Sequence, residues 1–501
     1  MKLEEPPAAR RAVTLEKLIA VDRLEVGPVK VEERRIACPY RLLHAAGEDR
    51  FFLEYRYEED VFDPDDPDLR NVAAMTAAQA ALNYSLFSAQ IVFRDTFDAA
   101  DRRFLRVMGE NTAREIYVNK LLEPNAFLAP GFQVPEIRLA RYAQARLSFR
   151  PEPQSSGRPS GWLASNSSRC AVLSSGGKDS LLSFGLLDEL GRDPHPIFVN
   201  ESGRHWFTAL NAYRHFRETV PNTSRVWTNA DRLFAWMLRH LPFIRRDFAQ
   251  VRSDYYPLRL WTVAVFLFGS LPLLIKRRIE TLVVGDEYDT THKADHRGIP
   301  HFAGLYDQSI YFDRALTAYF RRKKWNVRVV SLIRPLSELL IEKTLAERYP
   351  ELQRHQVSCH AAHARDGRIY PCGRCEKCRR IMTMLGVLGV DPERCGYTAE
   401  QVSLCLERIG EGNLHLEEEA IRHIFYLLGR RAEGCPHVMK LRIHPRNAPL
   451  SEYPEDLALF LLPLLLEHAD GAVRWRGGAW RETDVMKTLR ARHRLDREDR
   501  K

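Results

Sequence analysis

Residues 170–183 are CAVLSSGGKDSLLS, which is a short apolar run, a glycine-rich turn and then the start of a helical pattern. This order predicts a buried strand that leads through a tight loop into a helix. Adjacent glycines let the backbone approach an anion closely, and the free N–H groups at a helix start attract phosphate. The stretch therefore predicts a phosphate-binding loop in an α/β fold.

Three further apolar runs, at 195–200, 281–285 and 326–333, alternate with helical patterns after this loop. Strands that alternate with helices predict a parallel sheet covered on both faces. The most apolar stretch, 261–275, is shorter than the roughly 20 residues needed to span a bilayer. We expect it to be a buried helix, and we expect a cytoplasmic protein without membrane segments, because the N-terminal residues show no secretion signal.

The changes in pattern along the chain predict three units. They are an N-terminal α+β accessory or substrate domain (1–165), a parallel-sheet domain with the phosphate loop (166–395) and a C-terminal helical region (396–501). In the first unit we expect a strand pair near 51–62 and helices over 72–93 and 99–122. Residues 151–168 are rich in Pro, Gly and Ser, which is typical of a linker.

The side chains of the loop suit phosphate and metal contacts. Lys178 supplies a positive charge, and the carboxylate of Asp179 is a ligand that Mg²⁺ prefers. The adjacent glycines and the Lys-Asp order distinguish the loop from the Walker pattern. We predict that Lys178, Asp179 and Ser180 are catalytic, and that the nucleotide is bound by Ser175, Gly176, Gly177, Lys178, Asp179 and Ser180.

Four of the nine cysteines lie close together, with the spacing C-x12-C-x2-C-x2-C: Cys359, Cys372, Cys375 and Cys378. In a reducing compartment such a cluster indicates metal binding or catalysis before disulfides. Four thiolates fill the tetrahedral shell of Zn²⁺, so the spacing predicts a structural zinc knuckle at 359–378.

The loop resembles the SGGxDS loop of the N-type ATP pyrophosphatases, the PP-loop family. The resemblance implies an adenine nucleotide alpha-hydrolase-like domain, and an enzyme that splits ATP into AMP and pyrophosphate while adenylating its substrate. It also implies that the second strand, at Val199, lies beside the adenine. By the same resemblance, Gly285, Asp286 and Asp289 after the third strand contact the nucleotide or Mg²⁺.

The loop and the cysteines together resemble the zinc-containing 7-cyano-7-deazaguanine synthases, over about 169–382, including IRPLSE at 333–338. That resemblance implies a ligase that activates a carboxylate, and related proteins in antiphage operons apply such chemistry to a protein. The long front region with LEYRY at 53–57 also resembles the ATP-dependent epimerases of UDP-N-acetylmuramoyl-L-alanyl-L-glutamate. An epimerase needs a base, for which 292–301 offers His292, Asp295, His296 and His301.

The net charge of +9 permits nucleic acid as a partner but does not require it. A tRNA-modifying PP-loop enzyme therefore stays an alternative, although the basic run 321–324 is typical of a solvated helix end. We expect a small-molecule or protein substrate with a carboxylate or an amine, in a pocket between the front unit and the strand ends. The sequence also allows a homodimer. A non-catalytic nucleotide-binding subunit is disfavoured by Lys178 and Asp179.

Overall fold

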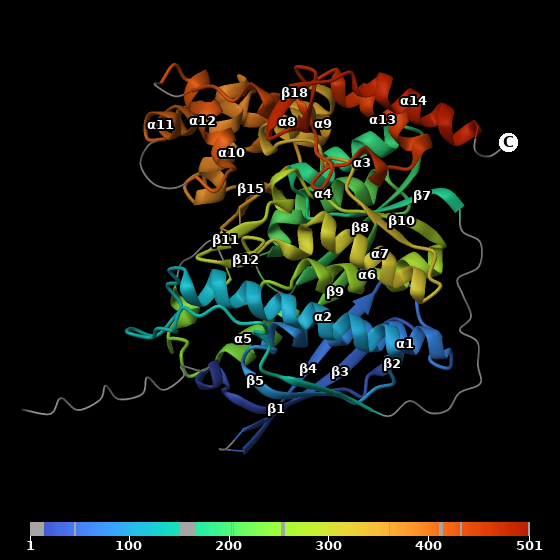
Figure 1. Ribbon diagram of the computed structural model, residues 1–501, viewed down its shortest axis with the longest axis vertical. Helices are drawn as coiled ribbons and strands as arrows, with labels where there is room; N and C mark the ends of the chain where they lie inside the picture. The colour runs from blue at the N-terminus through green and yellow to red at the C-terminus, as the bar shows by residue number, and fades with distance from the viewer. Residues whose placement is uncertain are drawn as a thin grey trace, which may run out of the picture.

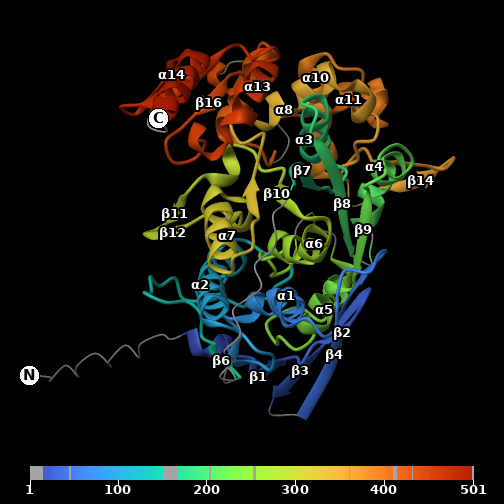
Figure 2. The same ribbon diagram turned by 90° about the vertical axis from the view of Figure 1, so that its right-hand side faces the viewer.

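The computed structural model describes residues 15–44, 47–150, 166–201, 203, 205–251, 256–359, 361–409, 414–430 and 433–498. Most of the predicted linker, 151–165, lies outside these residues. Figure 1 and Figure 2 show three tiers. The N-terminal strands and helices lie at one end and the C-terminal region at the other. The middle tier holds the strands around the loop that the sequence predicts to bind phosphate, which we call the phosphate loop.

One eleven-stranded sheet runs through the first two tiers, in the order β13-β10-β7-β8-β9-β4-β3-β1-β5-β6, with β2 paired to β3. Its strands are β1 (Val21–Val26), β2 (Lys30–Glu32), β3 (Arg35–His44), β4 (Gly47–Tyr57), β5 (Ser88–Phe93), β6 (Arg146–Phe149), β7 (Asn166–Leu173), β8 (Asp193–Glu201), β9 (Ser224–Thr228), β10 (Ile279–Val283) and β13 (Arg328–Val330).

The five strands from β13 to β9 are all parallel, as the alternation of strands and helices predicted. At β9 the direction changes, because β4 pairs with it antiparallel and sets Tyr55 opposite Thr228 and Tyr57 opposite Val226. The strands of the N-terminal unit therefore continue the sheet that carries the phosphate loop. The predicted boundary at 165/166 separates two stretches of sequence that share one sheet.

Helices cover both faces of the parallel half of the sheet. The helices that precede the C-terminal region are α1 (Pro67–Ala78), α2 (Ala99–Ile116), α3 (Lys178–Glu189), α4 (His205–Thr219), α5 (Ala230–Leu238), α6 (Val263–Arg277), α7 (Ile310–Arg322), α8 (Glu338–Arg348), α9 (Pro350–Gln353) and α10 (Glu376–Leu388). Of these, α3, α4, α6 and α7 pack directly on the parallel strands, whereas α5 packs on β4. One hydrophobic core joins α6 and α7 to α1 and α2 of the N-terminal unit. The other joins α3, α4, α8 and α10 to the C-terminal region.

The apolar run at 261–275 forms the buried helix α6, as predicted. Asp307 accepts hydrogen bonds from the backbone N–H groups of Thr262 and Val263, both at 2.8 Å, and so satisfies donors at the start of the helix. Lys276 and Arg277 lie in its last turn, where positive charge is favourable. Among the described residues, no helix has both the length and the apolar character needed to cross a membrane.

The N-terminal unit differs from the sequence expectation in two places. The segment 72–93 is not one helix, because α1 ends at Ala78, a 3-10 turn follows, and SAQIVF forms strand β5. Parallel pairing with β1, and burial of Ile91 and Phe93 on one side of the strand, outweigh the helical pattern there. The strand pair expected near 51–62 is also wrong, since β4 is a single strand whose hairpin partner β3 precedes it. Helix α2 and a π turn cover 99–122, as predicted.

The C-terminal region contains the expected helices and also a sheet that the sequence interpretation missed. Its helices are α11 (Ala399–Glu407), α12 (Glu418–Leu427), α13 (Glu455–Leu466) and α14 (Val485–Glu498), and its strands are β16 (Leu441–Ile443), β17 (Ala472–Arg476) and β18 (Ala479–Glu482). Gly477 and Gly478 have φ values of +58° and +80° and form the two-residue turn between β17 and β18. Two small hairpins, β11 (Ala294–His296) with β12 (Ile299–His301) and β14 (His363–Arg365) with β15 (Arg368–Tyr370), project from the middle tier.

Candidate functional site

The phosphate loop follows β7 and needs glycine at its first turn. Gly176 has a φ of +75°, which is in the left-handed region that glycine adopts freely. A Cβ at this position would lie 2.8 Å from the Cα of Ala209 and 3.0 Å from the carbonyl oxygen of Thr208, both in α4. The Gly176 N–H donates to Ser174 Oγ at 3.4 Å. The loop is therefore packed against α4 through its backbone.

Helix α3 begins directly after the loop, with Gly177 as its N-cap. Because glycine has no side chain to accept a hydrogen bond, the first N–H groups of α3 have no side-chain cap, and an anion can take that place. Ser180 Oγ donates to the Gly177 carbonyl oxygen at 3.1 Å and stabilises the turn. Ser175 is exposed at the loop surface.

Lys178, the first residue of α3, lies among carboxylates although only 4% of its surface is exposed. Its Nζ is 2.7 Å from Asp179 Oδ1, 3.2 Å from Glu338 Oε1 and 3.3 Å from Glu287 Oε2. Burial disfavours its charge, but these three carboxylates outweigh burial and hold the pKa of Lys178 well above its ordinary value. Lys178 is therefore a fixed positive charge at the base of the loop.

The carboxylates around Lys178 outnumber the cations. Glu338 Oε1 also lies 3.3 Å from Arg380 Nε, while Glu338 Oε2 is buried without a hydrogen-bond partner among the described residues. Burial raises the pKa of Glu287 well above its usual range. Burial and then the charge of Glu338 raise the pKa of Asp289 to about 6. Asp179, Glu287 and Glu338 thus share two cations, Lys178 and Arg380, which leaves an excess of negative charge that a divalent cation could neutralise.

The residues predicted after the third strand separate into two groups. Gly285 lies against the loop, because a Cβ there would be 2.7 Å from the Cβ of Asp179. Asp286 instead faces Arg334, at 3.2 Å, and the same guanidinium binds Asp313 at 2.6 Å. The structure therefore brings Gly285 to the loop, while Asp286 belongs to a buried ion-pair network. Asp289 is close enough to Glu338 and Lys178 for their charges to shift its pKa.

Val199, predicted to lie beside the adenine, packs on the α6 side of β8. A Cβ at Gly269 of α6 would lie 3.6 Å from Val199 Cγ1. Among the histidines considered as bases, His296 Nδ1 lies 3.0 Å from Glu123 of the N-terminal unit, and His301 Nδ1 accepts the Ala303 N–H at 3.0 Å.

The sequence interpretation did not identify Glu338 and Arg380. From the acidic run after Gly285 it selected Asp286 and Asp289 rather than Glu287, which contacts Lys178. It missed Arg442 of β16 as well, for which the local sequence carries no signal. Arg442 is fully buried, binds Glu417 at 2.6 Å and lies 3.8 Å above the ring of Tyr288. Two of its nitrogens have no hydrogen-bond partner in the part of the chain that the structure describes.

The four predicted cysteines converge, and they could hold a metal ion such as zinc. Their sulfur atoms all lie within 4.8 Å of one another, with 3.6 Å between Cys375 and Cys359 and 3.8 Å between Cys372 and Cys378. The N–H groups of Cys372, Cys375 and Cys378 each donate to the sulfur of the preceding cysteine at 3.4 Å. These donors favour thiolates, the form in which cysteine binds metal.

The cysteine site lies against the phosphate loop. The Val357 N–H donates to the Gly176 carbonyl oxygen at 3.4 Å, just ahead of Cys359. Helix α10 begins at the cysteines and carries Arg380 to Glu338. The cysteine segment and α10 therefore contact both the phosphate loop and the Lys178 cluster.

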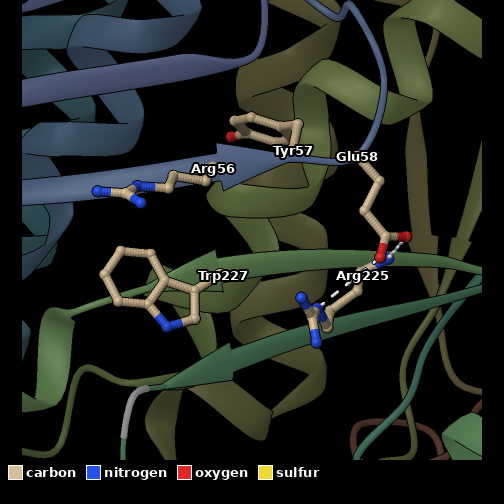
Figure 3. Close-up of a pocket in the computed structure, with 5 residues that line it drawn as sticks. All are labelled: Arg56, Tyr57, Glu58, Arg225 and Trp227. Atoms are coloured by element: carbon tan, nitrogen blue, oxygen red, sulfur yellow. Dashed lines mark hydrogen bonds and ion pairs between the residues drawn. The ribbon is translucent and has the colours of Figure 1, made fainter.

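A separate surface depression of about 300 Å³ lies where β4 meets β9. Figure 3 shows Arg56 above Trp227, with Arg225 beside Glu58. The guanidinium of Arg56 is 5.0 Å from the centroid of the Trp227 ring. Arg56 also binds Glu54 at 2.8 Å, and Arg225 lies 3.8 Å from Glu58. Since both arginines have carboxylate partners, this depression is not a strongly basic surface.

Two comparisons with known proteins returned no match: no protein-family model matches the chain, and no curated protein does.

Proposed function

We propose that the protein binds ATP at the loop after β7, splits it between the α- and β-phosphates and transfers AMP to a substrate. The observation that carries this proposal is the loop itself. Gly176 adopts a left-handed backbone, an uncapped helix start follows, and Lys178 is held buried beside it. Together these features present free N–H groups and one cation to a phosphate chain.

In this proposal the groups around Lys178 have two roles, which are to bind the phosphates and to hold Mg²⁺. The first N–H groups of α3 and Lys178 hold the β- and γ-phosphates, and Lys178 stabilises the charge that develops on pyrophosphate. Asp179 and Glu287 would hold Mg²⁺, and the excess of carboxylates supports that fit, as does the unpartnered buried oxygen of Glu338. Bound Mg²⁺ would neutralise charge on the phosphate oxygens.

The chemical step is the displacement of pyrophosphate by a substrate carboxylate. Its oxygen attacks the α-phosphorus, the bond to the bridging oxygen breaks, and an acyl-adenylate forms. Ammonia or an amine then displaces AMP from the acyl group. We favour a carboxylate acceptor, on a small molecule or a protein, over a nucleic acid, because the arginines of the exposed depression already have carboxylate partners.

We further propose that the cysteine site holds a structural zinc ion. Zinc–sulfur bonds of about 2.3 Å in a tetrahedron set the sulfurs about 3.8 Å apart. The sulfur–sulfur distances of 3.6 and 3.8 Å agree with that value. Four protein ligands leave no open position for a substrate. The metal would instead stabilise the start of α10 and the segment at Val357 that contacts the phosphate loop.

A product assay with the full-length chain tests the adenylation proposal. The protein is incubated with ATP, Mg²⁺ and a panel of carboxylate substrates, with and without ammonium, and nucleotides are separated by chromatography. We expect AMP and pyrophosphate, whose formation depends on substrate and is at least about 10²-fold slower in a Lys178→Met variant. ADP and phosphate without AMP would contradict the proposal, and turnover that requires tRNA would replace the carboxylate acceptor with a nucleic acid.

A further inference from the structure

The hairpin of β3 and β4 brings a histidine and an aspartate to the same face of the sheet. Leu42 pairs with Asp49 and His44 pairs with Gly47. Side chains of paired residues point to one face, and side chains two residues apart along a strand share that face. His44 and Asp49 therefore point the same way, and a second histidine, His240, approaches them from the end of α5.

The three side chains are arranged as ligands around a common point. His44 Nε2 lies 3.6 Å and His240 Nε2 lies 3.8 Å from the same oxygen, Asp49 Oδ2. All three atoms lie within 4.8 Å of one another. A tetrahedral zinc with bonds of about 2.0–2.1 Å sets its ligands about 3.4 Å apart. The two histidine–aspartate distances exceed this value by only a few tenths of an ångström.

The same distances argue against an ordinary histidine–carboxylate pair. Both contacts are longer than the hydrogen bond of 2.7 Å between His468 and Glu347, so neither histidine makes a close hydrogen bond to Asp49. Moreover, His44 Nε2 is buried and has no hydrogen-bond partner among the residues that the structure describes. The arrangement thus keeps the spacing of metal ligands and leaves a buried imidazole nitrogen without a donor or acceptor.

The surroundings of the cluster suit a metal ion. Trp236 packs edge-on against the ring of His240, with 5.2 Å between centroids, and restricts its rotation. The adjacent Arg41 and Arg50 both bind Glu48 and so do not compete for Asp49. The Asp49 side chain is 53% exposed, which leaves solvent access to a fourth position.

We propose that His44, Asp49 and His240 form a zinc-binding site, separate from the four cysteines, in which water is the fourth ligand. Two imidazoles and a carboxylate are a ligand set that zinc accepts. The bound ion would tie the β3–β4 hairpin to the end of α5. This inference does not depend on the adenylation proposal, because neither the loop nor Lys178 takes part in it.

The test is a metal titration of the full-length chain with Zn²⁺, followed by elemental analysis, and a parallel titration with Co²⁺. We expect two zinc ions per chain. We expect a His240→Ala variant to retain one, with the strong thiolate absorption of cobalt unchanged because the cysteines are intact. A His44→Ala variant should behave in the same way, and circular dichroism would verify that both variants remain folded.

A His468→Gln variant is the matched control. His468 pairs with the carboxylate of Glu347, but among the described residues it belongs to no group of side chains that could hold a metal ion. The variant should still bind two zinc ions. One zinc ion in the unaltered chain, with no change on replacing His44 or His240, would overturn the proposal. Two ions that both persist in a His44→Ala, His240→Ala double variant would overturn it equally.

Discussion

The cysteine site and the Lys178 cluster differ in how far apart along the chain their residues lie. The four cysteines fall within 359–378, and a hairpin followed by the first turn of α10 is enough to bring them together. The Lys178 cluster joins the loop to residues that follow β10, begin α8 and lie on α10. A site whose residues are close in sequence can be predicted from their spacing. A site that tertiary packing assembles can be recognised only once the fold is known.

We expect the largest loss of stability from a substitution at the cysteine site. A Cys375→Ala variant should lose the metal held there and be destabilised by several kcal/mol, because a structural zinc contributes folding free energy directly. Cys38→Ala and Cys435→Ala are the controls, since both remove buried thiols outside the metal site and should cost only about 1 kcal/mol. Urea unfolding with metal analysis measures this. Equal stabilities of Cys375→Ala and Cys38→Ala would show that the cysteines hold no structural metal.

At the phosphate loop the main effect should fall on rate. A Lys178→Met variant should form AMP about 10²-fold more slowly or worse, because the lost cation meets charge that develops in the transition state. It should also be less stable, since Glu287 and Glu338 then lose the cation between them. Lys293→Met, which removes an exposed lysine, is the control. Undiminished AMP formation by a folded Lys178→Met variant would remove Lys178 from the mechanism.

The features that could be predicted from the sequence are those whose residues lie close together along the chain. The loop, its strand and its helix were predictable because the glycines, the apolar run and the helical pattern are adjacent. The role of Glu338 was not, because only the packing of α8 against α3 and α10 brings it to Lys178. Asp286 and Glu287 are neighbours in sequence but face Arg334 and Lys178 respectively. A run of acids predicts that carboxylates are present, but not which of them reaches the site.

The shared sheet was the other feature that the sequence could not reveal. The pairing of β4 with β9 joins residues about 170 positions apart, and neither strand has a pattern that specifies its partner. The two-glycine turn at Gly477 is a counterexample, since a short-range hairpin signal was present there and was missed. The errors thus lie mainly, but not only, in long-range pairing.

Gly176 in the phosphate loop and Gly373 at the cysteines both have a left-handed backbone, with φ values of +75° and +70°, but they have different neighbours. A Gly176→Ala variant should be destabilised by about 1–3 kcal/mol and bind ATP more weakly, since its Cβ would meet the backbone of Ala209 at 2.8 Å. In Gly373→Ala, at the cysteines, the Cβ would meet the end of the Gln401 side chain, which can swing aside. That variant should lose about 1 kcal/mol, close to Gly191→Ala, where the space is open. Chemical denaturation and ATP titration measure these effects, and equal losses in all three would contradict the packing argument.

The smallest effect concerns a histidine pair that connects the two regions. His215 of α4, the helix that contacts Gly176, stacks on His355, with 4.2 Å between ring centroids, just before the segment that leads to Cys359. Burial, and then the charge of His215, lower the pKa of His355 to about 4. The folded-state pKa is below the unfolded value of about 6.5, so this contribution to stability is present above about pH 6.5 and is lost as the pH falls toward about 4.

A His355→Gln variant should therefore lose about 1 kcal/mol less stability than the unaltered chain between about pH 7 and about pH 4.5, once solvent screening of this partly exposed ring is allowed for. Urea unfolding at the two pH values gives the difference directly. If both proteins lose the same stability, protonation of His355 does not loosen the contact between α4 and the cysteine segment.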